Sequence, residues 1–234
     1  MYAKIRFFWG ALVLGSIIAV IMIPFIHIFP RHKASIMHYL NKIILKLIGA
    51  RVQTVGFRDA KANLFIMNHQ SIIDIVLMEA IEDVNWRWVA KKELFNMPIY
   101  GHLLKGGDMI EVDRENKAGL IKLIKDARES IEIKKRSVAI FPEGSRAKGQ
   151  ELLSFKAGTR FIANKLQMRV QPIVILGSKW ILDEHMKTAH SGQLKVIYLP
   201  AFDVKDAPKD WYKQTASLMQ NTIDKEYQEY HIKR

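Results

Sequence analysis

The sequence predicts an α/β protein with a mixed, largely parallel sheet that is covered by helices and preceded by a membrane-associating helical segment. From Arg51 onward, short β-like runs alternate with helical runs, as in such sheets. The preceding residues are instead apolar or amphipathic. A chain of 234 residues with 49% apolar content can build one sizeable core. We expect residues 1–50 to attach the protein to a membrane and residues 51–234 to form the catalytic domain.

The first apolar stretch, at residues 7–29, contains no Asp, Glu, Lys or Arg. As a helix its 23 residues would cover about 34 Å, enough to cross a hydrocarbon core of roughly 30 Å. It exceeds the ~7–15 apolar residues of a signal peptide, so we expect it to remain attached. Basic residues flank both ends, and Pro24 and His27 weaken the far end. Crossing the membrane and lying within it are both left open.

An amphipathic helix follows at residues 34–50. Its apolar face carries Ile36, Leu40, Ile43, Ile44 and Leu47, and lysines lie on other faces. Such a helix suits a membrane interface, with the lysines near anionic headgroups, and equally suits packing on the domain.

The rest of the chain contains seven strand candidates and two long helix candidates. The strands are expected at Val52–Phe57, Asn63–Met67, Trp86–Ala90, Met109–Val112, Ser137–Phe141, Val170–Leu176 and Leu194–Leu199. The clearest helices are expected at residues 117–133 and 208–230. In sheets of this kind, ligands bind in the loops beyond the strand ends.

Composition narrows the chemistry. The net charge of +13 predicts an anionic partner, such as acidic lipid, phosphorylated small molecules or nucleic acid. Basic residues are not interleaved with base-stacking aromatic residues, so we expect no nucleic acid. The absence of cysteine excludes a disulfide, a thiolate zinc site and a thiol nucleophile. The glycines at 105–116 lack the Lys-Ser/Thr pair of a P-loop and no H-E-x-x-H occurs, so we predict no metal.

The stretch NHQSIID at residues 68–74 places His69 after a buried strand and Asp74 in a capping-box pattern. With His69 in the turn and Asp74 in the first helical turn, the imidazole folds back over the carboxylate. Asp74 then orients His69 as a base. Since no G-x-S-x-G elbow or cysteine is present, the nucleophile would be a substrate hydroxyl or water. The alternative is a structural role, with Asp74 as a helix cap only.

Two more strand ends carry candidate binding residues. Pro142 to Arg146 form a tight turn, in which Arg146 offers a donor fork suited to phosphate. Asp113 and Arg114 follow another strand in the same way. Lys156 is a further phosphate candidate, although as a lone residue the preferred interpretation is a plain surface lysine.

These residues form four ordered blocks that resemble the glycerolipid acyltransferases, most closely the bacterial enzymes that acylate lysophosphatidate. The blocks are Asn68-His69-x4-Asp74, Val112-Asp113-Arg114, Phe141-Pro142-Glu143-Gly144-Ser145-Arg146 and Val170-Gln171-Pro172-Ile173. The resemblance covers roughly residues 51–200. Ser145 stands where the family often has Thr, and Glu111-Val112 precede Asp113 where Phe-Ile is common, which affects the detail of the phosphate site.

The resemblance implies a glycerolphosphate acyltransferase-like fold and an O-acyltransferase that makes phosphatidic acid for phospholipid biosynthesis. It implies His69 as general base, oriented by Asp74. The residues expected to bind the substrate are Asn68, Asp113, Arg114, Glu143, Gly144, Ser145, Arg146 and Lys156. The acyl donor would be a thioester, either acyl-CoA or acyl carrier protein, and no cofactor is expected. The implied location is the cytoplasmic face of the inner membrane, in contact with the lipid bilayer.

Two alternatives are left open. One is an acyltransferase whose acceptor is another lysophospholipid or glycerol phosphate. The other is a non-catalytic membrane protein that binds anionic lipid, for which His69 and Asp74 would be dispensable.

Overall fold

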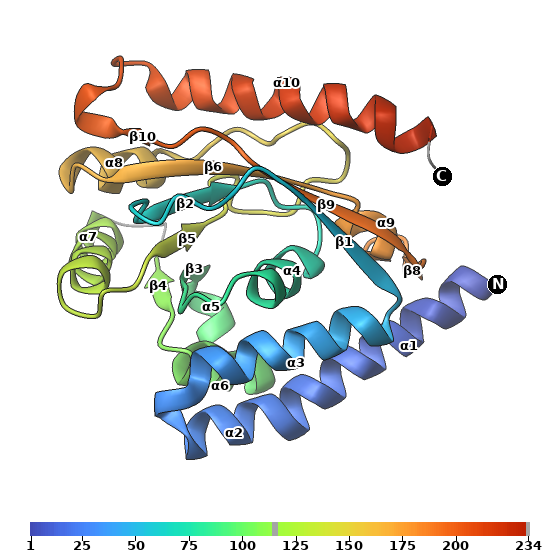
Figure 1. Ribbon diagram of the computed structural model, residues 1–234. Coiled ribbons are helices and arrows are strands. Elements are labelled where there is room, and N and C mark those ends of the chain that lie inside the picture. Colours follow the sequence, from blue (N-terminus) through green and yellow to red (C-terminus); the bar gives the residue numbers. More distant parts are fainter. Residues whose placement is uncertain (114–116, 233–234) are drawn as a thin grey trace.

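The computed structural model describes residues 1–113 and 117–232, and a central sheet organises them (Figure 1). Within these residues the strand order is β1-β9-β6-β2-β5-β3-β4, with β10 also on β6. The strands are β1 Ala50–Val55, β2 Leu64–Met67, β3 Arg87–Lys91, β4 Ile110–Val112, β5 Val138–Ile140, β6 Arg169–Leu176, β9 Gly192–Tyr198 and β10 Phe202–Asp203.

Most neighbouring strands run in the same direction. From β6 through β2, β5 and β3 to β4 the pairing is parallel throughout, as it is between β1 and β9. The pairings of β6 with β9 and with β10 are antiparallel. The predicted fold, a mixed and largely parallel sheet with helices, is confirmed. Each of the seven predicted strands exists, with ends shifted by one or two residues.

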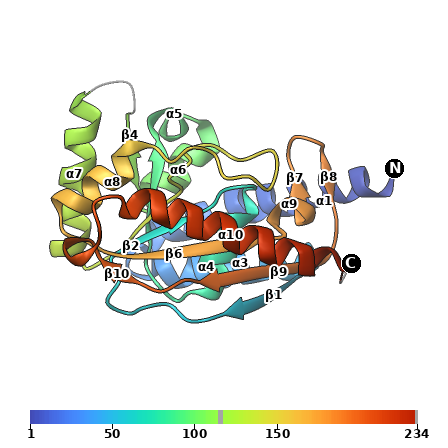
Figure 2. The same cartoon turned by 90° about the horizontal axis from the view of Figure 1, so that it is seen from above.

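Helices cover both faces of the sheet, and the pleat of β2 assigns its side chains to two cores. Phe65 and Met67 face the core beneath α1, α3 and α4, whereas Leu64 and Ile66 face the core beneath α7, α8 and α10. Seen from above, α10 lies along β6 (Figure 2). The helices are α1 Tyr2–Ser16, α3 Lys33–Leu47, α4 Ile73–Ile81, α7 Lys117–Glu132, α8 Ala157–Lys165 and α10 Trp211–Ile232.

The N-terminal apolar stretch forms one helical rod over Tyr2–Ile28, long and apolar enough to cross a membrane by length and composition. It comprises α1, a π-helical segment at Ile17–Met22 and α2 Ile23–Ile28. The wider π turn precedes Pro24, which has no N–H to donate to the turn before it. One face, including Leu14 and Met22, is buried on the protein, while Phe8 and Leu12 are exposed on the other.

The amphipathic helix α3 returns along this rod and packs on α4, so the apolar face predicted for residues 34–50 is partly a packing face (Figure 1). Several short elements were not predicted from the sequence. They are α5 Lys92–Phe95, α6 Pro98–Gly106, α8 Ala157–Lys165, α9 Ser178–Ile181, the hairpin β7 Leu182–Asp183 with β8 Thr188–Ala189, strand β10 Phe202–Asp203, and the 3-10 turns Pro30–His32 and Val204–Asp206.

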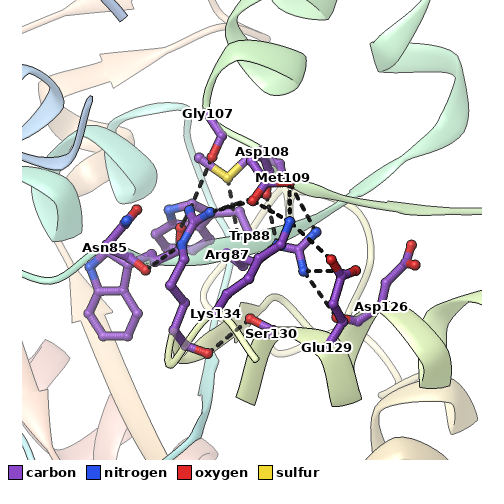
Figure 3. Close-up of polar contacts among 12 residues, drawn as sticks. Asn85, Arg87, Trp88, Gly107, Asp108, Met109, Asp126, Glu129, Ser130 and Lys134 are labelled. Carbon is purple, nitrogen blue, oxygen red and sulfur yellow. Dashed lines mark hydrogen bonds and ion pairs between the residues drawn. The ribbon is translucent and has the colours of Figure 1, made fainter. Parts of the chain in front are cut away.

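A polar cluster lies at the amino ends of β3, β4 and β5 (Figure 3). Asp108 accepts hydrogen bonds from Arg136 Nη1 at 2.9 Å and from Lys134 Nζ at 2.7 Å, and Arg87 Nη2 lies 3.3 Å from its other oxygen. Both arginines are buried and also donate to backbone carbonyls, including that of Gly107 from Arg136. We call these four side chains the amino-end cluster; they tie three strand starts together.

Candidate active site

The sequence-predicted site residues gather at the opposite, carboxyl edge of the sheet. His69 follows β2, Asp113 follows β4, and the turn from Phe141 to Arg146 follows β5. Because parallel strands all end at the same edge, segments far apart in the sequence meet there. Arg114, the second predicted phosphate ligand, lies outside the described residues.

His69 and Asp74 are in direct contact, in the geometry expected from their spacing. His69 Nδ1 lies 2.9 Å from Asp74 Oδ2, with His69 in the turn and Asp74 in the first turn of α4. The same oxygen accepts the backbone N–H groups of Gln70 at 2.7 Å and Ser71 at 2.9 Å. Asp74 is fully buried. It therefore holds the turn before α4 and the imidazole at once, although it does not cap the helix. The contact makes Nδ1 the protonated nitrogen and leaves Nε2 able to accept a proton.

An aromatic stack supports the histidine ring from behind. The rings of His69 and Phe141 are stacked with centroids 3.9 Å apart, and Trp88 stacks on Phe141 at 5.2 Å. The His69 side chain keeps 12% exposure, and among the described residues its Nε2 has no hydrogen-bond partner. Its position is therefore fixed on two sides while one nitrogen remains accessible.

Glu143 clamps the loops around the histidine. Its Oε1 accepts the N–H of His69 at 2.8 Å and its Oε2 accepts that of Leu153 at 2.7 Å. Burial raises the pKa of Glu143 to about 7, against the effect of the two hydrogen bonds. With both oxygens engaged and 1% exposure, Glu143 supports the site from within. A direct contact between Glu143 and substrate stays a prediction.

The turn after β5 presents its last residues to solvent. Gly144 has a φ of 69°, a left-handed conformation that glycine adopts without cost, and its N–H bonds to Phe141 at 3.0 Å. The turn then exposes Ser145 and Arg146. Arg146 Nη1 pairs with Glu184 at 2.9 Å, and the same Glu184 oxygen accepts the N–H of Ile72 at 2.9 Å. Glu184, which sequence reasoning did not identify, thus links the Arg146 turn to the start of α4.

The remaining predicted residues occupy supporting or outlying positions. The amide of Asn68 exchanges two hydrogen bonds with the backbone of Ile175, at 2.8 and 2.7 Å, and is buried. Asp113 forms an ion pair with Lys92 at 3.4 Å. Lys156 is exposed at the start of α8, outside the residues that line the cavity described next. Their substrate-binding roles stay predictions.

A cavity of about 380 Å³ opens beside His69 and runs along α4. One helical stripe, Ile72, Ile75, Val76 and Glu79, forms its floor over roughly 10 Å, at ~1.5 Å per residue. Ser145 and Arg146 lie at the His69 end. The other apolar walls come from the N-terminal rod, α3, β3, the α5–α6 segment and the residue before β4. They include Ile18, Met22, Met37, Trp88, Val89, Leu94, Met97, Tyr100, Leu103, Leu104 and Met109. Sequence reasoning missed this cavity.

One carboxylate lies far from the exposed edge of the cavity. Glu79 accepts the indole N–H of Trp88 at 2.6 Å, and its burial raises its pKa to about 7. Within residues 1–113 and 117–232, no three His, Asp or Glu side chains are grouped so as to hold a metal ion. The site therefore consists of one oriented imidazole, one exposed arginine and a long apolar cavity.

Comparisons with known proteins show what the chain is similar to. Residues 51–176 match the family model described as acyltransferase. The chain is 34% identical to a 1-acyl-sn-glycerol-3-phosphate acyltransferase of Helicobacter pylori, over 96% of this chain and 95% of that protein. It is 26% identical to the Escherichia coli protein of the same name, over 86% and 82% respectively. The fold matches the crystal structure of a 1-acyl-sn-glycerophosphate acyltransferase of Thermotoga maritima, with a TM-score of 0.78 and 18% identity over 96% of this chain and 95% of that one.

Proposed function

The chain belongs to the acyltransferase family, and from this premise we propose that it transfers a fatty acyl group from a thioester to the free hydroxyl of lysophosphatidic acid. The product would be phosphatidic acid. Two relatives that match most of the chain are named for this acceptor. The observation that carries the proposal is the oriented imidazole of His69 at the end of an enclosed apolar cavity.

In the proposed reaction, His69 Nε2 takes the proton from the acceptor hydroxyl as its oxygen attacks the thioester carbonyl. The carbon–sulfur bond then breaks, and the leaving thiolate takes up the proton. Asp74 stabilises the imidazolium that forms in between, because its carboxylate is 2.9 Å from Nδ1. General base catalysis of this kind contributes roughly 10²–10⁴-fold to a rate. Since the thioester is already activated, the chemistry calls for no metal or redox cofactor.

The cavity along α4 would bind the acyl chain of the donor. Its walls are mostly apolar, and each buried methylene contributes about 0.8 kcal/mol to binding. The α4 residues that line the cavity end at Glu79, and the length of this lining would limit the chains that fit. Acyl-CoA and acyl carrier protein carry the same acyl chain, so the choice between them depends on how the protein binds the carrier outside this cavity.

Arg146 is the proposed phosphate ligand within the described residues. Its guanidinium is partly exposed beside His69, and only one of its N–H groups is taken by Glu184. A charge-assisted bond from the remaining donors would fix the glycerol phosphate and bring its hydroxyl to His69. Ser145 and Arg114 would add to this site.

Membrane attachment follows from the exposed face of the N-terminal rod, which carries Ile5, Phe8, Leu12, Val20 and Phe25. We place this face in the lipid, on the cytoplasmic side of the inner membrane. The acceptor and the product are both membrane lipids, and this arrangement would deliver the acceptor laterally from the bilayer.

The test is an assay of purified protein in detergent, with lysophosphatidic acid and either acyl-CoA or acyl carrier protein loaded with the same chain. Phosphatidic acid should form with at least one donor. Glycerol phosphate and lysophosphatidylcholine serve as competing acceptors. Formation of product from another acceptor alone would reassign the substrate, and no transfer to any acceptor would favour a lipid-binding protein.

A further inference from the structure

A second apolar space meets the active site at Arg146. It is a groove of about 240 Å³ between α1 and α6, and its α1 wall is one helical face. That face consists of Phe7, Ala11, Leu14, Gly15 and Ile18, opposite Ile99 and Tyr100 of α6. The polar residues of the groove are Arg146 and Glu184. We call it the α1 groove.

The α1 groove and the larger cavity share part of their lining. Ile18, Ile72, Tyr100 and Arg146 border both, whereas His69 borders the larger cavity alone. The two apolar spaces therefore diverge from one polar centre, where an arginine lies beside the catalytic imidazole. An enzyme that attached one chain to a small polar acceptor would need one such space.

A reaction on a lysolipid needs two. The acceptor already carries one acyl chain, and the donor brings another, so two chains must leave a single glycerol in different directions. Resting on the proposed function, we propose that the α1 groove binds the acyl chain already present on the acceptor, while the cavity along α4 binds the chain being transferred.

Two features favour this assignment over the reverse. The thioester carbonyl must reach His69, which borders only the larger cavity. The α1 groove lies against the rod whose outer face, including Phe8 and Leu12, is exposed and apolar, so a membrane lipid reaches it directly. Arg146, the cation proposed for the acceptor's phosphate, borders both spaces, so it remains within reach of a headgroup whose chain lies in the α1 groove. Glu184 forms an ion pair with Arg146 there and accepts the N–H of Ile72.

Gly15 offers a position at which a substitution can test the proposed role of the α1 groove. It lines the groove, and a Cβ added there meets nothing within 4 Å outside its own helix. A large side chain at this position would fill the groove without displacing its neighbours. Leu12 lies on the exposed face of the same helix, outside the groove, and offers a control that places the same phenyl ring on that face.

The experiment compares wild type, Gly15→Phe and the control Leu12→Phe, using octanoyl- and oleoyl-lysophosphatidic acid as acceptors and a series of donor chain lengths. We expect Gly15→Phe to raise the KM for the oleoyl acceptor by roughly tenfold or more, because that chain loses its contacts. The KM for the octanoyl acceptor should rise by a smaller factor, because a shorter chain has fewer contacts to lose. The donor chain-length profile should stay that of wild type, as should both acceptor KM values for Leu12→Phe.

A reciprocal variant, Ala90→Leu, fills the larger cavity and should shorten the preferred donor chain without changing the KM for the oleoyl acceptor. Gly15→Leu provides a smaller plug if the Phe variant folds poorly. The groove assignment is overturned if both Gly15 variants bind the oleoyl acceptor as wild type does, or if they shift the donor profile instead. Failure of wild type to acylate any lysolipid would refute the proposed function itself.

Discussion

The two ends of the parallel strands each carry a cluster of polar side chains, and the two clusters differ in how their hydrogen-bonding groups are used. At the amino ends, the guanidinium groups of Arg87 and Arg136 donate hydrogen bonds to Asp108 and to backbone carbonyls. At the carboxyl ends, Glu143 accepts backbone N–H groups, and Asp74 holds one imidazole nitrogen of His69. The other imidazole nitrogen and the remaining donors of Arg146 face a cavity. The comparison distinguishes polar side chains that stabilise the sheet from those that remain available to bind a ligand.

The pKa shifts of two carboxyl groups express the same difference. Burial opposes ionisation of Asp108, but the hydrogen bond from Lys134 and the charges of Arg87, Lys134 and Lys33 outweigh it, so the pKa of Asp108 is lowered. Burial of Glu143 outweighs the hydrogen bonds from the N–H groups of Leu153 and His69, and its pKa rises to about 7. The amino-end cluster therefore stabilises the carboxylate of Asp108, whereas the surroundings of Glu143 disfavour a carboxylate.

His69→Ala should have the largest effect at the carboxyl end. We expect turnover of lysophosphatidic acid to fall roughly 10³-fold, because the proposed general base is lost. The Tm should fall by only a few degrees, since the ring lies at the rim of the core with 12% exposure. Vesicle binding measured on the same preparation should match that of wild type. Turnover near wild type would remove His69 from the mechanism.

Arg136→Met tests the amino end. Removing the guanidinium leaves Asp108 short of a partner and several carbonyls without a donor, at a cost of about 3–5 kcal/mol. The Tm should drop by roughly 10 °C. Turnover per folded molecule should stay close to that of wild type, measured below the Tm of the variant. A loss of turnover with an unchanged Tm would contradict the claim that the amino-end cluster stabilises the fold without taking part in the reaction.

Glu143→Gln should change how stability responds to pH. In wild type the folded carboxyl group, with a pKa of about 7 against 4.5 for the free group, holds its proton more tightly than the unfolded one. Stability conferred by this group is therefore lost as pH rises from about 4.5 to about 7. Between pH 5 and pH 8 the variant should gain about 2–3 kcal/mol relative to wild type. Parallel curves of Tm against pH for the two proteins would contradict the raised pKa.

Asp74→Asn should have the smallest effect on turnover of the catalytic substitutions, a loss of roughly 10²-fold. The amide oxygen can still accept a backbone N–H, but the amide no longer holds the imidazole as an ionised acceptor does. KM for both substrates should change little, because Asp74 lies beneath the imidazole. Steady-state kinetics with both substrates varied would check this.

The strands and the His69–Asp74 contact could be predicted because they depend on local pattern. Alternating apolar runs indicated β2 and β6, and a five-residue spacing across a turn and a capping box placed the imidazole over the carboxylate. The family resemblance inferred from four ordered motifs is confirmed by the match over residues 51–176. Local signals also indicated the helices at residues 117–133 and 208–230.

The cavity, the α1 groove and the amino-end cluster depend on contacts between distant segments. Met22, Met37, Val76 and Leu104 appear in sequence as ordinary apolar positions, and only their convergence encloses a space. Nothing in the local sequence distinguishes Glu184 from the other acidic residues, of which the chain has 23 in all. Its ion pair with Arg146 forms only when the fold brings the two residues together. Arg87, Asp108 and Arg136 are similarly scattered along the chain.

The claim that Asp74 acts through His69 is tested most directly by a double-mutant cycle on turnover. Wild type, Asp74→Asn, His69→Ala and the double variant would be assayed together with saturating donor and acceptor. The account predicts that Asp74→Asn costs roughly 10²-fold in wild type and less than about twofold once His69 is alanine. An equal loss in both backgrounds would show that the carboxylate acts independently of the imidazole, contrary to the mechanism.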